Sequence, residues 1–428
     1  MSKTDQKELL DQLRGTHARL AAASIKAPVI AKPGPKITDL EAYKRISLVR
    51  SAGMAMGIES PLFRQIDAQS GTEVVIDGRT VVNFASYDYL SLNQDQDLRN
   101  TVQKAVAQWG VSATASRLVG GNHEYHAQLE RKVVELTGAE DAVALISGYL
   151  TNCTAIRTLV EAGDLVLVDA RAHNSIYEGI RVSGADHVSF PHNDWNWVDD
   201  YLASNRARFR NVLIAIEGLY SMDGDTPDLA RYVDIKKRHG TWLLVDEAHS
   251  IGVLGKTGRG LCEEQGIARV DVDVTIGTLS KAFCSSGGFI AGSRELVDLI
   301  RYGAPGFVYS VGLSAPVAAA ASHAIDRLLA EPTRVDQLKE LSIHFRRTAN
   351  GLGLDSGGPV DFAIQPIMIG DSVRATSVSN ALLLEGFNVL PIIAPAVPDK
   401  SARLRFFLNF AHSKPEIETV LNATARLL

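Results

Sequence analysis

The stretch AVALISGYLTNCTAIRTLVEAG, residues 142–163, decides the class of fold. It begins with a short apolar run typical of a buried strand, continues through a glycine turn, and ends in a segment that reads as a helix. Similar apolar runs follow at 165–169 (LVLVD), 212–216 (VLIAI), 242–246 (WLLVD) and 273–278 (DVTIGT). Apolar strands alternating with helices predict an α/β fold with a mostly parallel sheet that is covered on both faces.

The ends of the chain follow a different pattern. TEVVIDGRTVVNFAS has two apolar runs around Asp77-Gly78 and predicts a hairpin. After residue 325, the segments FAIQPIMIG, FNVLPII and RLRFFLNFA are expected to be strands of a second, smaller domain. A short amphipathic helix is expected within residues 4–23. We therefore predict a helix and linker at 1–45, a segment packing with the small domain at 46–87, a large domain at 88–325 and a small C-terminal domain at 326–428.

Composition excludes several classes of function. The chain has 428 residues and a formal net charge of −5, so no nucleic-acid partner is expected. We expect no signal peptide and no transmembrane segment, because the N-terminal residues lack an apolar core and the run at 315–325 is too short to span a bilayer. Cys153, Cys262 and Cys284 form neither a CxxC pair nor a zinc spacing, which favours reduced thiols in a cytoplasmic protein without a metal site.

Polar residues follow several of the predicted strands. In parallel sheets, ligands bind at the carboxyl ends of the strands. Lys281 lies among the small residues of TIGTLSKAFCSSGG (275–288), where a lysine either reaches the surface or acts as an amine. The residues that this rule brings together are Gly148, His173, Ser221, Asp246, His249 and Lys281.

These residues together suit pyridoxal phosphate. SGYLTN (147–152) predicts a phosphate cradle at a helix N-terminus. Asp246 can be a helix cap or an anion that keeps a pyridine nitrogen protonated, and His249 can face the same side. DEAH also occurs in nucleotide-driven helicases, but no GxxxxGK[ST] loop precedes it here, which excludes that interpretation. Lys281 would then form a Schiff base with the aldehyde of the cofactor, whose ring is an electron sink.

The chain resembles the α-oxoamine synthase family of fold-type I pyridoxal phosphate enzymes, over residues 46–427. HNSIYEG and GTLSKAF are most similar to the serine palmitoyltransferase branch. The resemblance implies a large domain with a mostly parallel sheet covered by helices, and a smaller C-terminal α/β domain. It rests on FASYDYLSL (84–92), SRLVGGNHEYHAQLE (116–130), SGYLTN (147–152), HNSIYEGIRVSGA (173–185), EGLYSMDGD (217–225), VDEAHSIGVLGKTGRG (245–260) and GTLSKAFCSSGG (277–288).

The resemblance also implies a role for each matching residue. The catalytic residues would be Lys281, which binds the cofactor and moves the α-proton, Asp246, which binds the pyridine nitrogen, and His173, which stacks on the ring and orients the substrate. The remaining cofactor contacts would come from His249 and Ser221 to the phenolic oxygen, from Gly148, Tyr149 and Thr278 to the phosphate, and from Ser310 to the phosphate of the neighbouring subunit.

Two positions depart from the family pattern. Val311 stands where the family often has a second hydroxyl residue, next to Ser310. Ile393 stands where many members have an arginine before a proline-rich segment, whereas the later family arginine is present as Arg405. Arg405 is therefore the predicted anchor for the substrate carboxylate, and Arg403, two residues earlier, faces the same side if this segment is a strand.

The activity that the resemblance implies is a decarboxylative condensation of an amino acid with an acyl thioester, giving an α-aminoketone. The acyl donor could be acyl-CoA or an acyl-carrier protein, and a homodimer with a shared active site is expected. An aminotransferase or lyase of the same fold is an alternative, which would release no thiol. A non-catalytic partner subunit is a second alternative, although Lys281 argues against it. The amino acid, the acyl length and the carrier stay open.

Overall fold

The computed structural model describes residue 34 and residues 36–358, 361–398 and 400–428. The chain divides into two compact units, 1–59 and 60–428. The helix predicted within residues 4–23 lies outside the described residues. The first unit contains η1 (Ile37–Asp39) and α2 (Glu41–Ala55), and α2 crosses the domain boundary predicted at residue 45.

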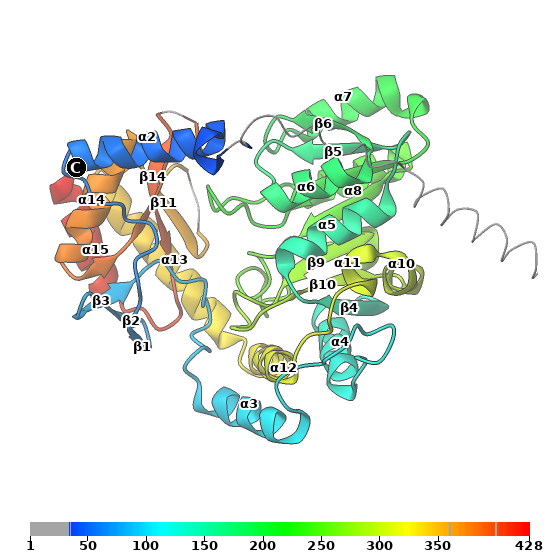
Figure 1. Ribbon diagram of the computed structural model, residues 1–428. Coiled ribbons are helices and arrows are strands. Elements are labelled where there is room, and N and C mark those ends of the chain that lie inside the picture. The colour runs from blue at the N-terminus through cyan, green and yellow to red at the C-terminus, as the bar shows by residue number, and fades with distance from the viewer. Residues whose placement is uncertain (1–33, 35, 359–360, 399) are drawn as a thin grey trace, which may run out of the picture. The chain divides into compact units, whose positions relative to one another are not determined.

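A seven-stranded sheet forms the centre of the second unit, in the order β4-β10-β9-β8-β7-β5-β6 (Figure 1). The neighbours from β9 to β6 pair in parallel, whereas β10 is antiparallel to both β9 and β4. The predicted mostly parallel sheet is thereby confirmed. The strands are β4 (Asp141–Leu145), β5 (Leu165–Asp169), β6 (Asp186–Phe190), β7 (Val212–Glu217), β8 (Trp242–Asp246), β9 (Val274–Thr278) and β10 (Gly288–Gly292).

Two strands of this sheet were missed by the sequence analysis. β6 is an edge strand whose residues are mostly exposed, so its sequence DHVSF lacks the apolar run of a central strand. β10 begins and ends with glycine, a residue that is depleted in strands. Neither segment shows the continuous apolar run by which the other five strands were predicted.

Helices cover both faces of the sheet. Figure 1 shows α5 (Gly148–Leu159), α6 (Asn174–Ser183) and α10 (Arg294–Gly303) on one face, and one buried apolar cluster joins them to the strands. A larger cluster covers the other face and continues into the C-terminal part of the unit. The remaining helices up to residue 330 are α3 (Gln96–Trp109), α4 (Glu124–Thr137), α7 (Trp195–Asn205), η2 (Arg206–Arg208), α8 (Leu229–His239), α9 (Leu261–Gln265), η3 (Arg269–Asp271), α11 (Pro305–Val308) and α12 (Ala315–Ala330).

Two smaller sheets contain the other strands. The predicted hairpin is present and turns at Asp77 and Gly78, whose φ angles are 49° and 71°. Its second strand pairs in parallel with β12, and this pairing joins the segment before the large sheet to the C-terminal part of the unit. These sheets contain β1 (Ala68–Ser70), β2 (Glu73–Ile76), β3 (Arg79–Asn83) and β12 (Phe387–Asn388), and then β11 (Ile364–Gly370), β14 (Ala402–Phe407) and β13 (Leu390–Ile392), with α13 (Thr333–Gly351), α14 (Ser372–Leu384) and α15 (Lys414–Leu427) beside them.

Candidate active site

A cavity of about 210 Å³ opens at the carboxyl ends of the central strands. Glu217, Asp246 and Thr278 are the last residues of β7, β8 and β9, and the strand register places Glu217 opposite Asp246. Of the ten residues predicted for the site, the structure brings seven together around this cavity: Gly148, Tyr149, His173, Asp246, His249, Thr278 and Lys281.

Lys281 is a sheltered amine at this cavity. Burial lowers its pKa to about 8, although the negative charges of Asp246 and Glu217 act in the opposite direction. The amine forms no salt bridge with any residue that the structure describes, and Nζ lies 5.8 Å from the centre of the Tyr87 ring. A lysine whose pKa is near 8 is partly neutral at physiological pH, and the neutral amine is the form that attacks an aldehyde.

Asp246 is a buried carboxylate with fixed hydrogen bonds. Its side chain is held by Asn152, whose Nδ2 donates to Oδ2 over 2.6 Å, and by the backbone N–H of Ala248, which donates to Oδ1 over 2.9 Å. The residue is 4% exposed. A buried anion with two donors in place is pre-oriented to accept a further hydrogen bond from a pyridinium nitrogen.

The two histidines of the site are held as neutral rings. The hydroxyl of Tyr89 lies 2.8 Å from Nδ1 of His249, and burial, with Lys281 adding to it, holds the pKa of His249 well below its usual value. Burial likewise lowers the pKa of His173, which caps the N-terminus of α6. Neutral imidazoles suit hydrogen bonding and ring stacking next to a cationic pyridinium, because they add no positive charge.

The start of α5 provides a place for a phosphate. Gly148 is its first residue, and a Cβ there would lie 2.7 Å from Oγ1 of Thr278, so only glycine leaves this space open. Ser280 adds a second hydroxyl, 2.8 Å from that of Thr278. Free N–H groups at a helix N-terminus together with two hydroxyls bind anions well. The amine, the carboxylate and this cradle fit pyridoxal phosphate.

Three predicted residues lie outside the cavity. Arg405, on β14, donates through Nη1 to the carbonyl oxygen of Ser221 over 2.8 Å, while its buried Nε has no hydrogen-bond partner among the described residues. Ser310 lies between α11 and α12, lines a different, small cavity and is not brought to Lys281 within this chain. Its neighbour Val311 forms an antiparallel bridge with Ser116.

Sequence reasoning missed the other residues that line the cavity. All of them belong to stretches that had been singled out, and each lies one to four residues from a residue that was named. They could have been found from their positions near strand ends and helix starts, because the carboxyl ends of parallel strands meet at one edge of the sheet. They are Ser147, Asn152, Ser175, Glu217, Ala248, Ile276, Gly277 and Ser280.

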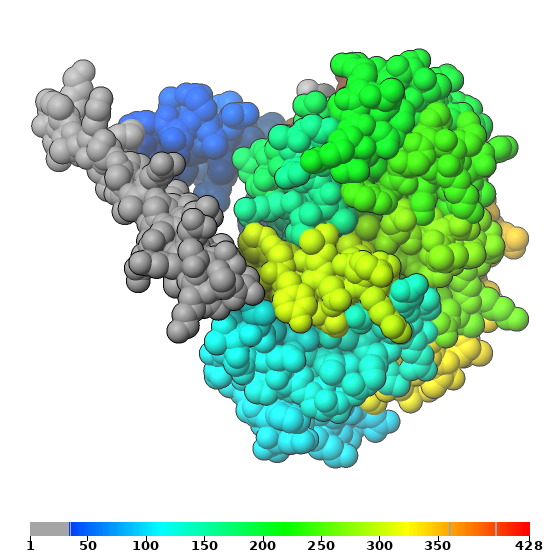
Figure 2. Space-filling model, turned by 90° about the vertical axis from the view of Figure 1, so that its right-hand side faces the viewer, coloured from blue at the N-terminus to red at the C-terminus, as the bar shows by residue number. Residues whose placement is uncertain are grey.

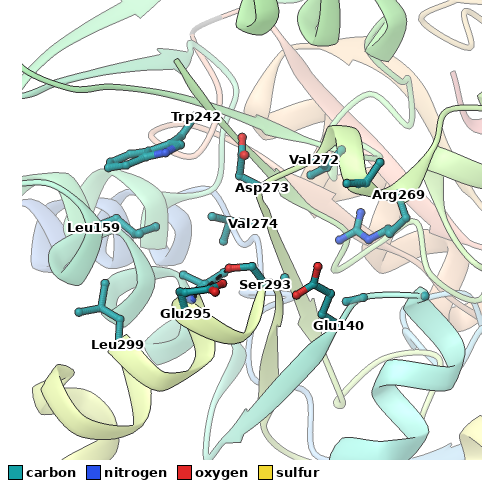
Figure 3. A pocket seen from close by; sticks show the side chains of 15 residues that line it. Glu140, Leu159, Trp242, Arg269, Val272, Asp273, Val274, Ser293, Glu295 and Leu299 are labelled. Carbon is teal, nitrogen blue, oxygen red and sulfur yellow. Dashed lines mark hydrogen bonds between the residues drawn. The ribbon is translucent and has the colours of Figure 1, made fainter. Parts of the chain in front are cut away.

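A larger cavity of about 550 Å³ lies at the opposite end of the same strands (Figure 3). It is lined by Trp242 and Val274, which begin β8 and β9, and by Leu159 and Leu299 from the helices. None of the predicted site residues lines this cavity. Its size alone therefore does not mark it as the place of the chemistry.

Two other kinds of site, a membrane span and a metal site, are absent from the part of the chain that the structure describes. No helix there is both long and apolar enough to cross a membrane. No group of three or more histidine, cysteine, aspartate or glutamate side chains there is arranged to hold a metal ion. Cys153, Cys262 and Cys284 are free thiols.

Comparison with known proteins defines the family. The model of the family described as aminotransferase class I and II matches residues 79–423, and the chain belongs to this family. Within it, the chain is an α-oxoamine synthase, a pyridoxal-phosphate-dependent acyltransferase, as the sequence analysis predicted. An 8-amino-7-oxononanoate synthase of Pseudomonas putida (strain GB-1) is 38% identical over 383 residues, 88% of this chain and 96% of the relative. A relative of the same name from Alcanivorax borkumensis is 37% identical, covering 91% and 97%.

Solved structures agree with this assignment. The serine palmitoyltransferase of Sphingomonas wittichii superimposes with a TM-score of 0.88 at 30% identity, covering 92% of this chain and 98% of that one. A serine palmitoyltransferase from S. paucimobilis with bound PLP and myriocin gives the same TM-score at 28% identity, with the same coverage. The fold-type I architecture is thereby confirmed, and pyridoxal phosphate is the cofactor of the family.

Proposed function

We propose that this chain condenses an α-amino acid with an acyl thioester in the cavity around Lys281. One C–C bond forms between Cα of the amino acid and the acyl carbon. The C–S bond of the thioester and the bond from Cα to the carboxylate break, which gives an α-aminoketone, carbon dioxide and a free thiol. The names of the relatives support this class of reaction: 8-amino-7-oxononanoate has its amine and ketone on adjacent carbons, and serine palmitoyltransferase names an amino acid and an acyl group.

The observation that carries the proposal is the sheltered amine of Lys281 in the same cavity as the buried carboxylate of Asp246. When bound, pyridoxal phosphate supplies an electron sink for the negative charge that develops at Cα. Asp246 would hold the proton on the pyridine nitrogen, because a buried anion favours the charged form of its partner. Lys281 would hold the cofactor at rest and remove the proton from Cα, a task suited to an amine with a pKa near 8.

Arg405 supports recognition of the amino-acid carboxylate. Its Nη1 is used by the carbonyl of Ser221, but its Nε has no partner among the described residues. Arg403 is less suited to this role, because its Nη1 already lies 2.6 Å from the carboxylate of Asp223. A guanidinium binds a carboxylate with two parallel hydrogen bonds, and Arg405 still has donors available for this purpose.

A homodimer with a shared active site is part of the proposal. Figure 2 shows the segment with α10 and α11, in yellow, at the surface beside the cyan segment that contains α4. Large apolar side chains are exposed next to the Ser116–Val311 bridge, with Val119 86% and Tyr309 85% exposed. Such a concentration of exposed apolar side chains is typical of a surface that another protein covers. A second copy seated here would bring Ser310 to the partner's phosphate.

Acyl-CoA and acyl-carrier protein both remain candidate donors, and we propose that the enzyme works in the cytoplasm, which its free thiols support. The test is a panel of amino acids against acyl thioesters of both carriers, followed by mass spectrometry of products and by a thiol assay. We expect an α-aminoketone, with thiol released only when both substrates are present. Formation of a 2-oxo acid without thiol release would identify an aminotransferase and overturn the proposal.

A further inference from the structure

We propose that Ser175 and Asn152 are positioning residues that fix the ring proton of His173 on Nε2. Neither residue was among those predicted for the site, yet both line the cavity of Lys281. The inference deepens the proposed function and rests on it only for its kinetic consequence. It concerns which nitrogen of a neutral imidazole is a donor, and this is decided by the hydrogen bonds around the ring.

Two groups of Ser175 meet one ring nitrogen of His173. The hydroxyl oxygen of Ser175 lies 2.7 Å from Nδ1, and the backbone N–H of Ser175 donates to the same Nδ1 over 3.3 Å. A backbone N–H can only donate, so Nδ1 must be an acceptor and carries no proton. The neutral ring then carries its proton on Nε2.

Asn152 holds the serine hydroxyl in place through a hydrogen bond to Oγ. Its Nδ2 donates to Oγ of Ser175 over 3.0 Å and to Oδ2 of Asp246 over 2.6 Å. The carboxylate accepts only, which fixes the amide with its nitrogen, rather than its oxygen, toward Asp246. Oγ of Ser175 accepts a hydrogen bond from Asn152, and because Nδ1 of His173 is an acceptor, the hydroxyl donates its own proton to Nδ1.

The four side chains form one chain of hydrogen bonds, from Asp246 through Asn152 and Ser175, which are buried, to His173, which is exposed at the cavity. Asn152 is 3% exposed and Ser175 is fully buried, so water does not compete strongly for these bonds. The backbone of His173 is fixed as well, because its N–H donates to Oε1 of Glu217 over 2.6 Å. Ring position and ring proton are thus set by the large-domain sheet and the helices α5 and α6 that pack on it.

The consequence is a ring with one available donor. Nε2 of His173 has no hydrogen-bond partner among the described residues, so Nε2–H is free for a carboxylate or carbonyl oxygen in the cavity. The opposite tautomer would place Nδ1–H against the N–H of Ser175, and two donors would face each other. The chain of hydrogen bonds therefore keeps His173 a hydrogen-bond donor, and not a proton acceptor, toward the cavity.

The test measures the tautomer directly. Full-length protein is labelled with ¹⁵N-histidine, with and without pyridoxal phosphate, and the signal of His173 is identified by its loss in His173→Asn. We expect the wild type to show a protonated Nε2 and an unprotonated Nδ1, and Ser175→Ala to shift toward the Nδ1–H form, because the 2.7 Å hydroxyl contact is lost and only the longer 3.3 Å backbone donor remains on Nδ1. Ser183→Ala is the matched control, because Ser183 lies in the same helix and donates to the carbonyl of Ile180, away from the cavity.

Two further readouts separate positioning from simple loss of structure. The pKa of His173 should rise in Ser175→Ala, because a hydroxyl that donates to Nδ1 opposes protonation there, and the acid limb of kcat/KM should move to higher pH. The kcat/KM itself should fall about tenfold, the size of one lost hydrogen bond. Ser175→Cys keeps a side chain of similar volume with a weaker hydrogen-bond donor, so the pKa of His173 and the kcat/KM in this variant should lie between those of the wild type and Ser175→Ala. Asn152→Ala should likewise increase the fraction of the Nδ1–H tautomer.

An unmixed Nε2–H form and an unchanged His173 pKa in folded Ser175→Ala or Ser175→Cys would overturn the inference. The NMR result does not depend on which reaction the enzyme catalyses. If the tautomer changes as expected but no α-aminoketone is found with any substrate, the proposed function fails while the assignment of Ser175 and Asn152 stands.

Discussion

The two ends of the seven-stranded sheet differ in what they offer to a ligand. At the amino end, Trp242 and Val274 begin their strands beside a cavity of about 550 Å³ with mostly apolar walls. At the carboxyl end, Asp246 and Thr278 end the same two strands beside a cavity of about 210 Å³. The smaller space holds an amine, two carboxyl groups and two histidines, and of these Glu217, Asp246 and His249 are buried.

This difference shows that the chemical groups lining a cavity indicate an active site better than the volume of the cavity does. At the amino end the carboxylate of Asp273 has a cation as its partner, since Lys236 reaches it over 2.8 Å. At the carboxyl end, burial lowers the pKa of Lys281 to about 8 and raises that of Glu217 well above its usual value. Perturbed groups with space in front of them are typical of active sites.

The largest effect is expected from Lys281→Ala. Removing the amine takes away both the covalent anchor of the cofactor and the group that moves the α-proton, and proton transfer alone is worth about 10²–10⁴-fold. Wild-type protein should be yellow, and borohydride should attach the cofactor to Lys281, which peptide mass spectrometry detects. Attachment to a different lysine in the wild type would show that this end of the sheet has been assigned wrongly.

Asp246→Asn should have the next largest effect. The amide has no charge with which to keep a pyridinium protonated, so kcat should fall by about 10²–10³-fold, at ~1.4 kcal/mol for each factor of ten. The absorbance of the bound cofactor should titrate at lower pH than in the wild type. Asp273→Asn, directly before β9, is the control for losing a carboxylate at the opposite end of the sheet. An unchanged kcat in a folded, cofactor-loaded Asp246→Asn enzyme contradicts the assignment.

Arg405→Ala should weaken amino-acid binding by about ten- to a hundred-fold, because hydrogen bonds to a charged group contribute ~1.5–3 kcal/mol. Arg405→Lys should recover only part of the loss, since an ammonium cannot reproduce the planar fork. Spectral titration with the amino acid measures both variants. Arg403→Ala is the matched control on the same strand, and it should lower stability through loss of the ion pair with Asp223 more than it lowers binding. The reverse result would transfer the role to Arg403.

Much of this site could be predicted because it depends on local patterns. Apolar runs ending in Asp246 and Thr278 predicted both the strands and the edge at which their last residues meet. Gly148 was recognisable because a glycine at a strand-to-helix turn suits a phosphate. The fold class followed from the same alternation of strands and helices.

The parts that were missed depend on contacts between distant segments. Tyr89 reaches His249 across 160 positions, and Asn152 reaches Asp246 across 94, and no periodicity encodes such pairs. Glu217 reads as the end of a strand, and its hydrogen bond to the backbone of His173 exists only once β7 and α6 are in place. Likewise, β10 lies between β4 and β9 and is antiparallel to both, and its own glycine-rich sequence does not predict this pairing.

A smaller effect, on stability, is expected from His192→Gln. His192 lies at the carboxyl end, with Nδ1 2.9 Å from Asp169 and Nε2 2.8 Å from Asp225. Burial alone lowers its pKa, but the two carboxylates outweigh this and raise it to about 9. Since the folded pKa lies above the unfolded value, the stabilisation is complete below about pH 6.5 and is lost as pH rises through 9.

Denaturant unfolding across this pH range measures the effect. His192→Gln should cost about 1–2 kcal/mol at pH 6, allowing for partial exposure of the ring, and much less above pH 9. The matched control is His239→Gln, since His239 is equally exposed but bonds to a single carboxylate, Asp199, over 2.7 Å. A loss that does not depend on pH would show that His192 acts by packing alone.

The smallest effect is expected at the larger cavity. Leu299 lies on α10 at its wall and is 46% exposed, so Leu299→Ala should change the free energy of unfolding by no more than ~0.5 kcal/mol. Leu299→Trp fills part of the same space without touching the carboxyl end, and it should leave kcat and KM unchanged, because the amine, the carboxylate and the phosphate cradle that fit the cofactor all line the other cavity. Steady-state kinetics with both variants provide the measurement. A fall in kcat/KM with Leu299→Trp but not with Leu299→Ala would mean that the enzyme uses this space, and the contrast between the two ends of the sheet would then fail.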